Sequence, residues 1–337
     1  MVQYIAQRVL LFIPTLIVIT LIAFGLTRLA PGDPAAVKAG VGAEGTLSAR
    51  NVMTRETFEL WRKQMRLDRP IAEQYILWLG DLARLDFGVS FIDNRPVLEK
   101  IAERLPITLA MNIAAVFLAY VIAIPLGVYS AVRAGSLGDR IVTFGLFALY
   151  SLPTFWVATL ALTFVCNPEF AYLFPPGGLY SNRFDFLPLW SKVGDVLWHL
   201  VLPMIVYTYG SFAFISRQMR SAMLETIRQD FIRTARAKGL PERRVIAIHA
   251  MRNSLIPIIT LLAGILPSLV GGSVIVETIF SIPGMGELSY MALVARDYPM
   301  IMAIFTLSAV LTLVGILLSD ILYSIVDPRI AYGKRTA

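Results

Sequence analysis

Residues 217–253 read RQMRSAMLETIRQDFIRTARAKGLPERRVIAIHAMRN, a long segment that is neither apolar enough to cross a bilayer nor loose enough to be a linker. The segment contains nine basic and three acidic residues. Between hydrophobic runs, an excess of Lys and Arg is typical of the cytoplasmic side of a membrane protein. We therefore expect this segment to face the cytoplasm.

Helical periodicity within the segment predicts two short helices that meet at a tight turn. Gly239 is suited to the left-handed conformation that closes a helix, and Pro241 is suited to the first turn of the next helix. No Gly or Pro interrupts the run before Gly239, so we expect one apolar stripe along it. The stripe consists of Met223, Ile227, Phe231 and Ala235. Such a stripe is buried either in lipid headgroups or in the cleft of a partner protein.

The composition of the whole chain is that of an integral membrane protein. Of its 337 residues 57% are hydrophobic and 16% are charged, against about 25% charged in soluble proteins, and the mean hydropathy is +0.68. The net charge of +7 follows from the cytoplasmic excess of Lys and Arg, so no nucleic-acid partner is expected. Apolar runs predict six transmembrane helices, at residues 9–27, 107–131, 141–165, 197–215, 255–276 and 299–326.

The segment between the first two spans, residues 31–104, is predicted to be a small folded insertion outside the cell membrane. It contains eleven basic and eleven acidic residues mixed with aromatic and apolar ones, and a loop of this length crosses the membrane largely regardless of its charge. Thr54 is a candidate N-cap for one helix, and Pro70 opens a second.

The distribution of charge decides the orientation of the six spans. The predicted inner segments contain 15 basic and 5 acidic residues, whereas the two short outer loops contain 3 basic and 6 acidic residues. This asymmetry places both chain ends in the cytoplasm. We divide the chain into an N-terminal helix (1–30), the insertion (31–104), a five-helix core (105–327) that includes the cytoplasmic loop 217–253, and a tail (328–337).

Two features within the spans suggest specific contacts. Gly264, Ser268 and Gly272 recur at four-residue intervals, which predicts a small-residue face for close helix packing. Asp320 lies near the inner end of the last span, where we expect it to face protein or water, or to be interfacial. The single Cys166 excludes an intrachain disulfide, and we expect no metal site.

Several stretches of this sequence resemble one family of transport proteins. DFIRTARAKGLPERRVIAIHAMRNSLIP (230–257), LDRPIAEQYILWL (67–79) and ETIFSIPGMG (277–286) resemble the dipeptide/oligopeptide permease group of binding-protein-dependent ABC importers. The general loop of these importers has an EAA triplet, three residues and then Gly. Arg233-Thr234-Ala235 stands in place of that triplet here, so its Glu is missing.

The resemblance implies an all-α membrane protein with the type I ABC importer transmembrane fold, in a bacterial inner membrane. It also implies a second, related permease chain, two cytoplasmic ATPases that bind ATP and Mg, and an extracytoplasmic binding protein as partners. The loop would dock into an ATPase, with Phe231, Ile232, Ala235 and Leu240 as buried contacts and Gly239 as the turn. Arg233 and Arg236 would form the polar rim of the docking surface. The remaining residues of the docking segment are Thr234, Ala237 and Lys238.

The absence of catalytic motifs agrees with a transport subunit that is not itself an enzyme. The sequence contains neither a P-loop for ATP nor an HExxH helix, and we expect no cofactor in this chain. An ion-coupled carrier would usually show internal repeats and several intramembrane acids, and a membrane-embedded enzyme would need clustered polar residues within the spans. The cargo stays open: peptides are expected first, but related permeases handle nickel chelates, glutathione, opines or oligosaccharides.

Overall fold

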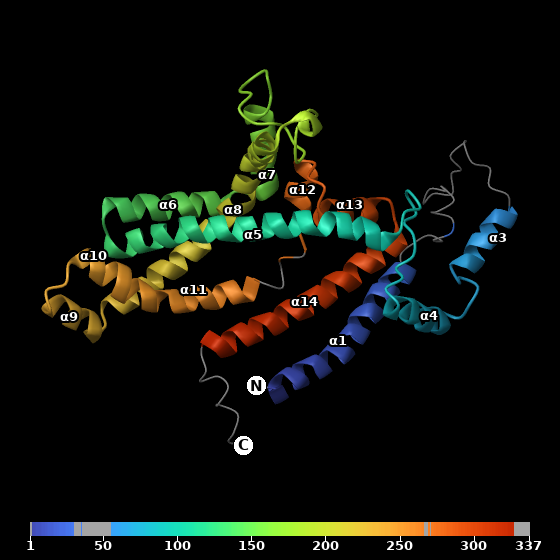
Figure 1. Ribbon diagram of the computed structural model, residues 1–337, viewed down its shortest axis with the longest axis horizontal. Coiled ribbons are helices and arrows are strands. Elements are labelled where there is room, and N and C mark those ends of the chain that lie inside the picture. Colours follow the sequence, from blue (N-terminus) through green and yellow to red (C-terminus); the bar gives the residue numbers. More distant parts are fainter. Residues whose placement is uncertain (1, 30–34, 36–54, 266–268, 270, 327–337) are drawn as a thin grey trace. The chain divides into compact units, whose positions relative to one another are not determined.

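The computed structural model describes residues 2–29, 35, 55–265, 269 and 271–326 of the chain. The described residues are mostly helical (Figure 1). Their contacts divide the chain into two units, which we describe separately. Unit 1 comprises residues 1–106 and 288–317, and unit 2 comprises residues 107–287 and 318–337.

Unit 1 is built on a long apolar helix and a pair of short helices from the insertion. The long helix is α1 (Val2–Leu29), and the insertion contributes α3 (Arg55–Gln64) and α4 (Ile71–Ala83). Pro70 is the N-cap of α4, which confirms the predicted start of this helix; Thr54 lies outside the described residues. The unit also contains the beginning of α5 (Val97–Val132) and most of α14 (Tyr298–Val326).

Unit 2 contains the rest of α5 and a series of helices packed against the long helix α8 (Leu189–Ile227), which contacts α6, α7 and α11. The other helices of the unit are α6 (Leu137–Ser151), α7 (Thr154–Val165), η1 (Phe184–Phe186), α9 (Asp230–Ala237), α10 (Glu242–Arg244), the π-helix η2 (Val245–Ala250), α11 (Met251–Ile265), α12 (Val274–Ile279) and the start of α13 (Met285–Val294).

The long apolar helices agree with the predicted spans, with two differences. In the part of the chain that the structure describes, five helices are long and apolar enough to cross a membrane, or six if one bent pair counts as a span. The bent pair is Leu137–Ser151 and Thr154–Val165, at 93°. The predicted span 141–165 is therefore interrupted by a bend that the sequence analysis did not anticipate. Pro153 has no backbone N–H and holds Leu152 in an extended conformation (ψ 126°), which ends the first helix.

The fifth span also differs from its prediction of 255–276. The apolar helix begins earlier, because α10, η2 and α11 follow one another and form the stretch Glu242–Leu262. Pro257 lies inside α11 as expected, while Pro267 falls outside the described residues. The loop that we predicted to be cytoplasmic is thus joined without a break to the apolar helix that follows it.

Candidate coupling site

The segment 217–253 forms an elbow of two short helices attached to two long ones (Figure 1). Helix α8 ends at Ile227, and the chain changes direction at Gln229, whose backbone is extended (φ −71°, ψ 152°). Helix α9 then begins at Asp230. The prediction of an uninterrupted helix up to Gly239 is therefore wrong. The helix breaks at Gln229, although the sequence has no Gly or Pro there. Because this break separates Met223 from Phe231, the predicted apolar residues do not form one stripe.

The two faces of α9 have different surroundings. Ile232 (0% exposed) and Ala235 (6% exposed) are buried in a core cluster of unit 2 with Met219, Met223 and Val245. The chain itself therefore covers two of the residues that we expected to be buried by an ATPase. Leu240 is partly buried against the same cluster.

The outer face of α9 is the part of the elbow that remains available to a partner. Phe231 is 43% exposed, and the side chain of Arg233 is 76% exposed and lies 3.4 Å from the Asp230 carboxylate. Thr234, Ala237 and Lys238 are exposed too. An exposed aromatic ring surrounded by charged and small side chains has the composition of a binding hot spot.

Gly239 forms the turn of the elbow as the sequence predicts. Its φ is +76°, in the left-handed region that disfavours residues with a Cβ, and its N–H donates to Arg236 O at 2.9 Å. Pro241 is the N-cap of α10 rather than a residue of its first turn.

An ion pair closes the elbow across this turn. The Arg236 guanidinium donates to both oxygens of Glu242, with Nε–Oε2 at 3.1 Å and Nη2–Oε1 at 2.6 Å. The hydrogen bond to Glu242 raises the pKa of Arg236. Arg236, which we expected in a polar rim, therefore connects α9 to α10.

A second ion pair, which sequence reasoning missed, fixes α8 next to the elbow. Asp139, whose side chain is 6% exposed, accepts from Arg220 Nε at 3.1 Å and from Arg220 Nη2 at 2.8 Å. Asp139 also accepts from the N–H of Gly135 at 2.9 Å, and Ser136 caps α6. The two predicted inner segments 132–140 and 217–253 therefore lie at the same end of unit 2.

The π-helix η2 joins the elbow to α11 and was also not predicted. Just beyond it, Ser254 Oγ donates to Ala222 O at 3.2 Å and lies 3.0 Å from Thr226 Oγ1, both on α8. These contacts fix α11 to α8. Single π turns inside helices are frequent at functional sites.

The predicted small-residue face is not a helical face in the structure. Gly264 lies on α11, Ser268 is outside the described residues, and Gly272 is non-helical with a φ of +64°. A Cβ on Gly272 would collide with the Glu277 carboxylate. Gly272 is therefore required by a loop and not by helix packing.

That loop is organised around Glu277, another residue that sequence reasoning missed. The side chain is buried (1% exposed). Its carboxylate accepts from the N–H groups of Gly286 (2.6 Å), Glu287 (3.1 Å) and Ser273 (3.2 Å), and from the Thr108 hydroxyl (3.3 Å). The sequence does contain a signal for this role, because Glu277 is an acidic residue in an otherwise apolar stretch. The carboxylate holds residues 273–287 against α5.

Two further residues that the sequence analysis singled out are Asp320 and Cys166. Asp320 is partly buried on α14. Within the described ranges, no group of three or more His, Cys, Asp or Glu side chains could hold a metal ion. Cys166 is buried and its Sγ contacts Pro175 O at 3.3 Å.

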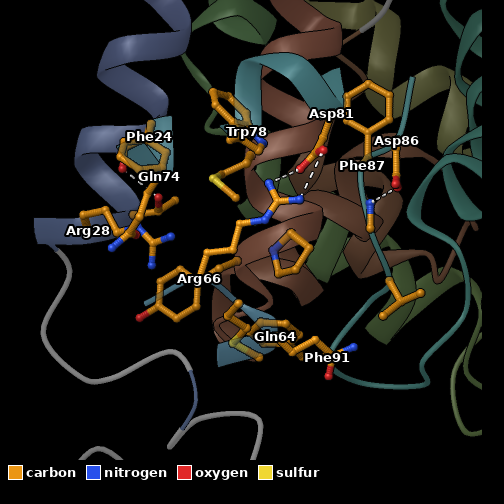
Figure 2. A pocket seen from close by; sticks show the side chains of 17 residues that line it. Phe24, Arg28, Gln64, Arg66, Gln74, Trp78, Asp81, Asp86, Phe87 and Phe91 are labelled. Carbon is orange, nitrogen blue, oxygen red and sulfur yellow. Dashed lines mark hydrogen bonds and ion pairs between the residues drawn. The ribbon is translucent and has the colours of Figure 1, made fainter. Parts of the chain in front are cut away.

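Unit 1 contains a pocket of about 250 Å³ at the C-terminal end of α1 (Figure 2). Its walls combine aromatic and charged side chains, and Arg66 Nη1 donates to Asp81 Oδ2 at 2.7 Å. Figure 2 shows Arg66 extending toward Asp81, with Trp78 of α4 beside them. The residues that line the pocket all belong to unit 1, the part of the chain that includes the insertion.

Comparisons with known proteins agree with this architecture. Residues 123–332 match the model of the family described as "Binding-protein-dependent transport system inner membrane component", and residues 1–112 match the model of its N-terminal region. A solved structure of the MetNI methionine ABC transporter shares the fold, with a TM-score of 0.52 and 19% identity over 68% of this chain and 97% of that chain.

Curated relatives match over nearly the full length. The oligopeptide transport system permease protein AppB of Bacillus subtilis (strain 168) is 41% identical, covering 98% of this chain and 100% of its own. A putative peptide permease of Brucella ovis is 37% identical, with 98% and 99% covered. The inner membrane ABC transporter permease protein YejB of Escherichia coli O157:H7 is 33% identical, with 98% and 99% covered. This chain therefore belongs to the family of binding-protein-dependent transport system inner membrane components.

Proposed function

We propose that this chain forms half of the translocation pathway of an ATP-driven importer of di- and oligopeptides. The proposed complex contains a second, related permease chain, two cytoplasmic ATPases that bind ATP and Mg, and an extracytoplasmic peptide-binding protein. The names of the relatives support peptides as cargo, since two of them are described as an oligopeptide permease and a putative peptide permease. This subunit would hydrolyse no ATP itself.

The observation that carries the proposal is the way the elbow is built into the helices around it. Helix α9 presents Phe231 outward and buries Ile232 in the chain's own core. On one side the elbow follows α8, and on the other it continues through η2 into the apolar stretch Glu242–Leu262. A partner that grips the outer face of α9 would therefore move both long helices together.

The Asp139–Arg220 pair extends this connection to a further pair of helices. It joins the first turn of α6 to α8 through two charge-assisted hydrogen bonds, which are among the strongest in proteins, and Asp139 also accepts from Gly135 in the turn after α5. In the proposed mechanism, closure of the ATPases moves the elbow, and α5, α6, α8 and α11 follow as one body. This movement would switch the pathway from inward-open to outward-open.

The direction of transport requires the elbow to face the cytoplasm. Lys and Arg are in excess in residues 217–253, which favours an inner location. We infer that both chain ends are cytoplasmic and that the protein lies in a bacterial inner membrane. Reaction of a Cys introduced at Lys238 with a membrane-impermeant thiol reagent in intact cells would contradict this orientation.

The docking role is tested with Phe231→Ala in the assembled complex. Loss of an aromatic hot spot costs at least about 2 kcal/mol of binding, so we expect ATPase subunits to be lost during purification and peptide uptake to fall more than about tenfold. Phe186→Ala is the matched control, because Phe186 is 89% exposed and lies far along the sequence from the elbow. Equal loss in both variants, or normal uptake by Phe231→Ala, would contradict docking through α9.

Gly239→Pro tests the shape of the elbow itself. Proline fixes φ near −65°, whereas Gly239 has a φ of +76°. We expect normal insertion into the membrane and loss of peptide-dependent ATP hydrolysis. Normal uptake by this variant at normal membrane levels would show that the elbow does not couple the ATPases to transport.

The cargo is tested separately by competition against uptake of a labelled peptide in the complete importer. Unlabelled di- and oligopeptides should compete. Competition by nickel chelates, glutathione, opines or oligosaccharides in their place would identify another cargo and leave the coupling role unaffected.

A further inference from the structure

Helix α4 (Ile71–Ala83) has the reverse of the pattern expected for a helix on the water-exposed surface of a protein. Its buried residue is Gln74, whose amide nitrogen donates to Arg69 O at 2.7 Å. Asp81, on the same side, pairs with Arg66. The exposed residues Ile71 and Ile76 are 66% and 67% accessible. A helix in water normally shows its polar residues outward and buries its apolar ones.

The outer face of α4 is apolar along nearly its whole length. At 100° per residue, Ala72, Ile76 and Ala83 lie within one narrow stripe, with Gly80 beside it, and all four are exposed. The exception is Glu73, in the first turn, whose carboxylate accepts from Arg69 at 2.5 Å. A charged pair at one end of the helix can reach the headgroups while the rest of the face stays in a less polar medium.

Contacts with α1 fix the depth at which α4 lies. The Tyr75 hydroxyl lies 3.0 Å from Thr20 Oγ1 and donates to Ile17 O at 3.2 Å. Phe24 lies against Tyr75 and Trp78, with ring centroids 5.4 and 5.8 Å apart. These α1 residues are within the apolar stretch Leu10–Leu29.

The rise of about 1.5 Å per residue in a helix gives the distance of each contacted α1 residue from Leu29 along the helix axis. Thr20 is nine residues before Leu29 and therefore about 13 Å along the helix from that end, while Phe24 is about 7 Å from it. The hydrocarbon core is about 30 Å thick, so Thr20 and Phe24 lie in the half that is nearer to Leu29, and Ile17, about 18 Å from Leu29, lies near the middle of the core. The side chains of Tyr75 and Trp78, which reach this part of α1, are therefore surrounded by the same medium as α1.

We propose that α4 lies within the membrane, in the leaflet that holds the C-terminal end of α1, with the face that carries Ala72, Ile76 and Ala83 against phospholipid acyl chains. Exposed apolar side chains of α1 at the same level, Ile17 (49%) and Leu21 (53%), continue this lipid-facing surface. The opposite face of α4 contributes Gln74, Trp78 and Asp81 to the pocket of unit 1 (Figure 2). The helix thus separates a polar pocket from lipid. The proposal depends on α1 crossing the membrane and not on the cargo or on the side that α1 ends on.

The test is the environment of a nitroxide label at Ile76→Cys in a Cys166→Ala background, in the assembled complex in phospholipid vesicles. Oxygen concentrates in acyl chains and a hydrophilic nickel chelate stays in water. We expect the Ile76 label to have a ratio of oxygen to nickel accessibility equal to that of a lipid-facing Leu21→Cys control. The ratio should be several-fold above that of Glu99→Cys, an exposed site on α5.

Two other results would overturn the proposal, because each would show that water or protein, and not lipid, covers the outer face of α4. High nickel accessibility at Ile76 would place α4 in water, and low accessibility to both probes would mean that protein covers this face. A label at Ala72→Cys, on the same stripe but with a smaller native side chain, repeats the measurement should Ile76→Cys fail to assemble. Peptide uptake by each labelled complex confirms that the protein is folded.

Discussion

Two glutamates of unit 2 are held in opposite ways. Glu277 is buried and accepts three backbone N–H groups and the Thr108 hydroxyl, whereas Glu242 is exposed and is held by Arg236 alone among the contacts that the structure describes. A buried polar group without a hydrogen-bond partner costs far more free energy than an exposed one. The hydrogen bonds of Glu277 therefore fix the conformation of its loop. The elbow takes its shape from Gly239 and from the burial of Ile232.

Glu277→Ala should have the largest effect on this contrast. The substitution leaves the N–H groups of Ser273, Gly286 and Glu287 without their acceptor, at about 1–3 kcal/mol for each buried group. We expect a destabilisation of at least about 3 kcal/mol, seen as a lower thermal unfolding midpoint and a smaller yield of assembled complex. Glu169→Ala, in an exposed loop, is the control. An unchanged midpoint for Glu277→Ala would refute the organising role of this carboxylate.

Arg220→Ala should follow, because it leaves Asp139 buried without its cation. Breaking a buried ion pair by removing one partner costs about 3–5 kcal/mol; since Arg220 is about a third exposed, we expect about 2 kcal/mol. The double variant Asp139→Ala with Arg220→Ala should be more stable than Arg220→Ala alone. Additive losses in the double-mutant cycle would mean that the two side chains do not interact.

Gly239→Ala should have a smaller and local effect. A Cβ in the left-handed region costs about 1 kcal/mol, and open space around Gly239 means that no steric clash adds to this cost. We expect the amides of α9 to exchange with solvent about fivefold faster while the thermal midpoint hardly changes. Gly145→Ala, at a helical glycine with equally open surroundings, should show no acceleration.

The sequence predicted those parts of the molecule that depend on local rules. Apolar runs located the long helices, Pro70 marked the start of α4, and Gly239 marked the elbow turn. The bend at Pro153 could have been predicted from the proline itself, but the long apolar run around it favoured a single span. The break at Gln229 had none, because α9 is set by the burial of Ile232 against residues of α8 and η2.

The parts that could not be predicted depend on residues far apart in the chain. Asp139 and Arg220 are 81 positions apart, and Thr108 and Glu277 are 169 apart, so a single sequence gives no indication that they meet. Exposure was equally hidden: Phe231 and Ile232 are neighbours with similar chemistry, yet only Phe231 faces outward.

Glu242→Gln should have the smallest effect of the four substitutions. It tests the exposed glutamate, in contrast to the buried Glu277. An exposed ion pair contributes about 0.5 kcal/mol and is screened by salt, so the loss should be measurable at low ionic strength and vanish near 1 M salt. Glu277→Gln is the matched comparison: its loss should persist in salt, because a buried neutral amide still replaces one acceptor oxygen with a donor that faces backbone N–H groups. If Glu242→Gln were as destabilising as Glu277→Gln, the elbow would be held by its charges, and the burial of Ile232 would be secondary.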